Sequence, residues 1–145
     1  MIHRQAGRRS ANAAVEFAVV LPFLAFITLV AVDFCRVFYY TLTIVNCARN
    51  GAQYASAVFN TKMQYGTGDG TDAVKKATIA DGANLKPPLQ DSDVTVTETT
   101  SNGENVVRVR VVYTFSTITS FPGIPSTITI DRTEEMRVAP QTPYD

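Results

Sequence analysis

A single carboxylate inside a long apolar run constrains this chain more than any other feature of its sequence. Residues 13–32 carry no charged side chain except Glu16. At about 1.5 Å of rise per residue, a helix over this run is roughly 30 Å long, enough to cross the hydrocarbon core of a membrane. A carboxylate costs about 2.5–3.5 kcal/mol at the membrane centre and less near an interface, so Glu16 should have a partner. The run predicts a transmembrane helix over residues 12–33.

Basic residues precede the run and determine its predicted orientation. Arg4, Arg8 and Arg9 face no acidic residue before Glu16, so residues 1–11 are expected to form a basic leader in the cytoplasm, with the C-terminal part outside. A cleaved secretory signal has the same basic start and apolar core. No clear small-x-small cleavage site ends this run, which continues into helical sequence, so we expect a retained helix.

The helical pattern continues beyond the predicted membrane segment, over residues 34–60. Apolar residues recur there at spacings of three and four. They are Val37, Tyr40, Ile44, Ala48, Ala52 and Ala55. We therefore predict one helix of about forty residues, whose second half covers a domain outside the membrane and whose Gly51 allows close packing.

Two cysteines, Cys35 and Cys47, lie in this helical segment. Their separation corresponds to about 18 Å of helix axis, whereas a disulfide needs Cα atoms within about 7 Å. A continuous helix therefore excludes a bridge within one chain. We expect small apolar packing residues, with a bridge between subunits as the alternative.

Residues 61–145 are predicted to form a small α+β domain outside the membrane. Glycines at 66, 68 and 70 indicate a loop, after which Thr71 or Asp72 is expected to cap a short helix running to about residue 84. Alternating apolar residues then predict strands over 93–99, 105–115 and 126–138, with an Asn102-Gly103 turn between the first two. The predicted fold class is α+β, a long N-terminal helix packed by its second half on a small antiparallel sheet, with one short extra helix.

The sequence offers no set of residues for catalysis. His3 is the only histidine, and no nucleophile-elbow, phosphate-loop or dinucleotide motif is present. Residues 51–145 carry eight basic and eleven acidic side chains, without a basic patch that would suggest nucleic acid. We expect a protein that is not an enzyme and that binds no cofactor, metal or nucleic acid.

Three segments of the N-terminal part carry a family resemblance. They are Ala13-Ala14-Val15-Glu16-Phe17-Ala18-Val19-Val20-Leu21-Pro22 after the arginines, Asp33-Phe34-Cys35-Arg36, and the small-residue helix of residues 46–55. Together they resemble the start of TadE-like proteins, a pilin-like family of tight-adherence (Flp) pilus systems.

The resemblance implies a single-pass subunit of the bacterial inner membrane, with membrane lipid, a prepilin peptidase, other pilin-like subunits and pilus assembly proteins as partners. In that family the peptidase cuts on the cytoplasmic side and leaves the glutamate fifth in the mature chain. Transferred to this sequence, the cut falls between Ala11 and Asn12.

Cleavage at that position would give Glu16 a role. The new α-amine of Asn12 would be a cation near membrane depth, and Glu16 of an adjacent subunit could pair with it, relieving two desolvated charges together. The simpler reading is a tolerated polar residue that reaches the headgroups. Two functions stay open: a minor pilin-like component in assembly of an adhesion pilus, and an unprocessed single-pass envelope protein whose outer domain binds a ligand or partner.

Overall fold

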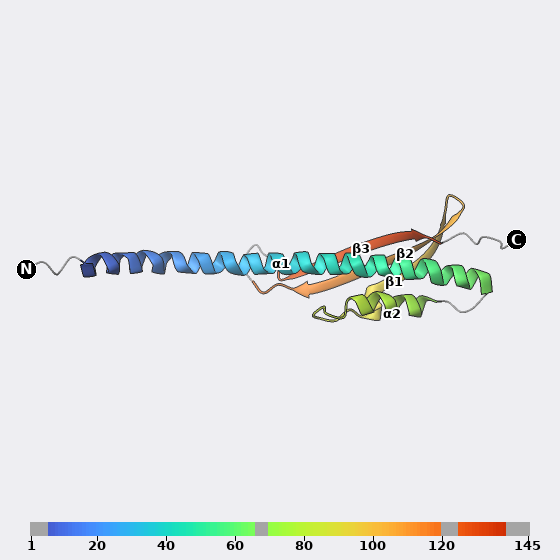
Figure 1. Ribbon diagram of the computed structural model, residues 1–145, viewed down its shortest axis with the longest axis horizontal. Coiled ribbons are helices and arrows are strands. Elements are labelled where there is room, and N and C mark those ends of the chain that lie inside the picture. Colours follow the sequence, from blue (N-terminus) through green and yellow to red (C-terminus); the bar gives the residue numbers. More distant parts are fainter. Residues whose placement is uncertain (1–5, 66–69, 120–124, 139–145) are drawn as a thin grey trace, which may run out of the picture.

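The long helix, the small sheet and one short helix form an α+β fold, as predicted. The computed structural model describes the backbone of residues 6–65, 70–119 and 125–138, and the side chains of these ranges except residues 6–11 and 60–65. In chain order the elements are α1 (Ala6–Tyr65), α2 (Thr71–Asp81), the 3₁₀ turn η1 (Asp91–Asp93), β1 (Val94–Ser101), β2 (Glu104–Ser116) and β3 (Thr127–Arg137). The strands form an antiparallel sheet in the order β1-β2-β3. In Figure 1, the sheet and α2 lie alongside the second half of α1, whose first half extends beyond them.

Helix α1 is longer than predicted, with 60 residues in place of about forty. It begins at Ala6, inside the expected leader, because alanine and arginine there are strong helix formers. It also continues past residue 60, where the predicted helix ends, to Tyr65, next to the first glycine of the loop. Phe59, which is 2% exposed, holds this last part against the domain. Pro22 lies within α1 and leaves the carbonyl of Ala18 without its helical donor.

The second half of α1 covers one face of the sheet. Its predicted apolar stripe is buried from Tyr40 through Ala55, apart from the partly buried Val37 that packs against the core. On the sheet, the predicted apolar face is buried as well. Its members on β2 are Val107, Val109, Val111, Tyr113 and Phe115. Burial of such side chains stabilises the fold by about 1.5–3 kcal/mol each, so the contact between α1 and the sheet contributes strongly to the domain's stability.

Gly51 lies where α1 approaches α2 and the sheet most closely. A Cβ atom at this position would overlap the hydroxyl of Thr78 on α2 and come within 3.1 Å of Cγ1 of Val109 on β2. Thr78 is fully buried and donates its hydroxyl to the carbonyl of Val74 at 2.8 Å, so it has little freedom to move. The predicted close packing at Gly51 is therefore confirmed.

The start of α2 differs from the prediction. The N-cap is Gly70, with φ of 69° and no side-chain cap, while Thr71 and Asp72 lie inside the helix. A Cβ at Gly70 would come within 2.6 Å of Cγ1 of Val58, so contact with α1 excludes a larger capping residue there. The helix ends at Asp81, short of the predicted residue 84, and Gly82 is buried against Cys47 and Leu85.

The turn between β1 and β2 is the predicted Asn102-Gly103 turn. Both residues have positive φ, 53° and 80°, and Ser101 pairs with Glu104, as a two-residue hairpin requires.

Charged residues occupy the solvent-exposed outer face of the sheet. Arg108 pairs with Glu135, and Arg110 pairs with Asp131 at 2.5 Å. The guanidinium of Arg110 lowers the pKa of Asp131 below its ordinary value. Because β3 is an edge strand, charges along it also discourage pairing with a second sheet.

Candidate functional site

Residues 12–29 of α1 are all exposed in the part of the chain that the structure describes. Their exposed large apolar side chains include Phe17 at 60%, Val19 at 71% and Phe23 at 62%. This helix is long and apolar enough to cross a membrane. A soluble monomer rarely exposes an apolar surface of this extent, so the segment requires lipid or other helices around it.

Glu16 lies on this bare part of the helix, one turn beyond Asn12. Both side chains are exposed, and residues four apart share one face of a helix. No described side chain forms a hydrogen bond or ion pair with Glu16. The backbone of Ala11 is helical, and its side chain lies outside the described residues. The structure thus places Glu16 and Asn12 on one exposed face of α1.

Asp33 forms a junction that the sequence analysis did not predict. Its carboxylate accepts the backbone N–H groups of Ile118 and Thr119, at 2.9 and 2.7 Å. The Thr119 hydroxyl also donates to it, and so does Arg36 at 3.2 Å. Asp33 is only 7% exposed. One side chain at the end of the apolar run therefore holds the segment that follows β2.

Aromatic rings pack against Arg36, the cationic partner of Asp33 in this junction. The guanidinium of Arg36 lies 5.6 Å from the ring centre of Tyr40 and 5.8 Å from that of Phe115. Tyr40 packs edge-on against Phe115 at 4.6 Å and against Tyr113 at 5.7 Å. Burial raises the pKa of Tyr113 to about 12, and its hydroxyl donates to the carbonyl of Pro87 at 2.9 Å. These contacts fix α1, β2 and the turn after α2 relative to one another.

The Asp33 junction gives a direct prediction for stability. Asp33→Asn should lower the free energy of unfolding by about 1.5–3 kcal/mol, because it removes a charged acceptor and points an amide donor at the N–H of Ile118 or Thr119. Thermal unfolding of the detergent-solubilised protein measures this change. The matched variant Asp91→Asn, at an exposed carboxylate, should stay within about 0.5 kcal/mol of wild type. Equal stabilities of the two variants would show that the junction contributes nothing.

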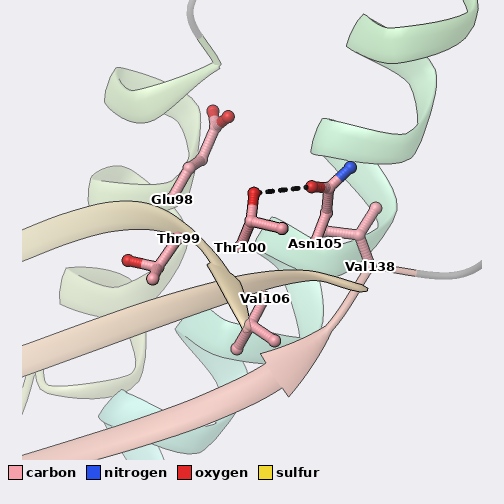
Figure 2. A pocket seen from close by; sticks show the side chains of 6 residues that line it. All are labelled: Glu98, Thr99, Thr100, Asn105, Val106 and Val138. Atoms are coloured by element: carbon pink, nitrogen blue, oxygen red, sulfur yellow. Dashed lines mark hydrogen bonds between the residues drawn. The ribbon is translucent and has the colours of Figure 1, made fainter. Parts of the chain in front are cut away.

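A small hollow lies at the end of the sheet near the hairpin turn (Figure 2). It has a volume of about 250 Å³. It is lined by Glu98, Thr99, Thr100, Asn105, Val106 and Val138. The Thr100 hydroxyl lies 3.2 Å from the side-chain oxygen of Asn105. Its lining of hydroxyls, one amide, one carboxylate and two valines matches no recognised arrangement of nucleophile, base and oxyanion donors. No group of three or more His, Cys, Asp or Glu in the described ranges is placed to hold a metal ion.

The two cysteines lie on different surfaces of α1. Cys35 is exposed at the end of the apolar run, whereas Cys47 is buried beneath α2. Both are free thiols, in agreement with the prediction that one helix cannot bridge them.

Comparison with known proteins bears on the N-terminal half. The family model of TadE-like protein matches residues 12–53. The match covers the exposed apolar segment, Glu16, Asp33 and most of the stripe that packs on the sheet. No curated protein and no solved structure matches the chain. The resemblance to TadE-like proteins predicted from the sequence is therefore confirmed over residues 12–53.

Proposed function

We infer that this protein is a membrane-inserted minor pilin-like subunit that takes part in assembling a tight-adherence (Flp) pilus. One observation carries the proposal: the segment that matches TadE-like proteins includes the stretch of helix that the fold leaves bare, with one carboxylate among apolar side chains. Such a segment suits lateral contact with lipid and with neighbouring helices. The role proposed is structural and not catalytic.

The proposed orientation follows from charge. The arginines before residue 12 favour a leader in the cytoplasm of a bacterium. The span would then lie in the inner membrane and the α+β domain outside it. A prepilin peptidase would cut between Ala11 and Asn12, and Glu16 would then pair with the α-amine of a neighbouring subunit. The matched range begins at Asn12, which would be the first residue of the mature chain.

The intact mass of the protein extracted from membranes tests the processing step. We expect the mass of residues 12–145 in cells with an active peptidase and the mass of the whole chain in cells lacking it. The mature chain should stay in the membrane fraction, because the cut leaves the apolar run intact. The full-length mass in both strains would contradict processing.

That last outcome would favour a second candidate, an unprocessed envelope protein whose outer domain binds a ligand or partner. One observation supports it: α1 runs unbroken from Ala6 through Asn12, so the bond to be cut lies in helical backbone. A peptidase would have to unwind this end before cutting it. Helix ends fray at little cost, so the continuity delays cleavage and does not forbid it.

A further inference from the structure

An apolar groove lies beside α1 where the helix leaves the predicted membrane segment. It has a volume of about 460 Å³. One wall is α1, including Ala31, Val32 and Tyr39, and the other is the turn after α2, including Asn84 and Lys86. The wall residues of α1 recur on one side of the helix, so the groove runs along the helix axis.

The Asp33 junction determines where the groove lies along α1, relative to the end of the apolar run. Ala31 and Val32 belong to the apolar run, while Arg36 and Lys86 lie just beyond its end. Because Asp33 holds the segment after β2 at this height, the outer domain meets α1 here. The groove therefore crosses the predicted border between hydrocarbon and headgroups, with its apolar end toward the membrane.

Two cations line the polar end of the groove. The guanidinium of Arg36 forms an ion pair with the carboxylate of Asp33 at 3.2 Å, and the Arg36 side chain is 29% exposed. Lys86 is exposed and has no ion-pair partner among the described residues. A ligand that matches this surface has an acyl chain running along the helix and an anionic group at the level of Lys86.

We propose that the groove binds an anionic phospholipid of the outer leaflet, with one acyl chain against Ala31 and Val32 and the phosphate near Lys86 and Arg36. This inference rests on the proposed insertion of α1 in the membrane. The groove is continuous with the exposed apolar surface of α1, which lipid would already surround. A cation near a membrane surface contributes about 1 kcal/mol toward anionic lipid, or roughly fivefold in relative affinity.

Tryptophan quenching tests the proposal, because the chain contains no tryptophan. Tyr39, which lines the groove and is 50% exposed, is replaced by Trp in the full-length protein. The variant is reconstituted in vesicles that contain brominated phosphatidylglycerol or brominated phosphatidylcholine at equal mole fraction. We expect the anionic lipid to quench Tyr39→Trp more strongly, at an apparent relative affinity about fivefold higher.

Removing single charges then tests whether the preference for anionic lipid depends on Lys86. Lys86→Gln, introduced into Tyr39→Trp, should abolish most of the preference, whereas Lys76→Gln removes the same charge from the exposed side of α2 and should leave it intact. Equal quenching of Tyr39→Trp by the two lipids would overturn the proposal. An unchanged preference for anionic lipid after Lys86→Gln is added would also overturn it. Protection from both lipids, with Cys35 cross-linking between copies, would also overturn it and assign the groove to a second copy of the chain.

A second probe separates this inference from the proposed insertion. Phe23→Trp lies in the middle of the apolar run, where Phe23 is 62% exposed, and should be quenched by either brominated lipid. Quenching there without a preference at Tyr39→Trp would reject the lipid site alone. Absence of quenching at both positions would reject the insertion of α1 as well.

Discussion

Glu16→Gln is expected to leave the leader cleaved and to abolish most pilus-dependent adhesion. Gln keeps the shape and hydrogen bonding of the side chain but removes the countercharge for the α-amine of a neighbouring Asn12. Breaking a buried ion pair by neutralising one partner costs about 3–5 kcal/mol, which corresponds to more than a hundredfold in affinity at that contact. The peptidase reads the residues around the cut and should still process the variant at least in part.

The measurement combines adhesion, filament counts and intact mass in cells that lack the wild-type copy. Glu135→Gln, on the exposed outer face of β3, makes the same chemical change away from the apolar run and should adhere normally. A bulky residue in place of Ala11 should act differently, because it blocks the cut and leaves no α-amine to pair. Normal adhesion by Glu16→Gln would refute the pairing, and normal adhesion by both variants would refute the pilin-like role.

Removing the second half of α1 should unfold the α+β domain. A fragment of residues 60–145 leaves the apolar face of β2 without its cover, including Val107 and Val109, which are fully buried in the whole chain. The contribution lost, at about 25 cal/mol per Å² of apolar area, is comparable to the total stability of a typical domain, about 5–15 kcal/mol. The fragment should therefore aggregate or bind a hydrophobic dye.

A fragment of residues 33–145 is the matched control. It keeps the covering stripe, the Asp33 junction and α2, and it omits the bare apolar segment. We expect cooperative thermal unfolding for this fragment, followed by circular dichroism, and little dye binding. If the shorter fragment also unfolds cooperatively as a monomer, α2 and the sheet alone form a sufficient core, and the importance assigned to α1 is wrong.

Most of the fold could be predicted because its signals are local. The alternation of β2 from Val107 to Phe115 and the Asn102-Gly103 turn determine a hairpin without reference to distant residues. The third strand and the short helix follow from the same reasoning. The packing stripe of α1 was also visible, since its spacing of three and four depends only on helical geometry.

Features that depend on distant contacts could not be predicted. Gly70 caps α2 because Val58 leaves no room for a side chain, and that neighbour is known only once α1 and α2 are placed. Asp33 contacts Ile118 and Thr119, 85 and 86 residues away. The pattern of Asp33 and Arg36 three residues apart was visible, yet it does not identify backbone N–H groups in the C-terminal half as its partners.

The unbroken course of α1 has a mechanical consequence. Its 60 residues form a rod of about 90 Å, shared between the apolar segment and the core of the α+β domain. No compliant linker lies between the two parts, so tension applied to the domain reaches the apolar segment directly, and any tilt of that segment swings the domain with it. Asp33 and the aromatic rings beside it resist the shear that such a load creates where the sheet meets the rod.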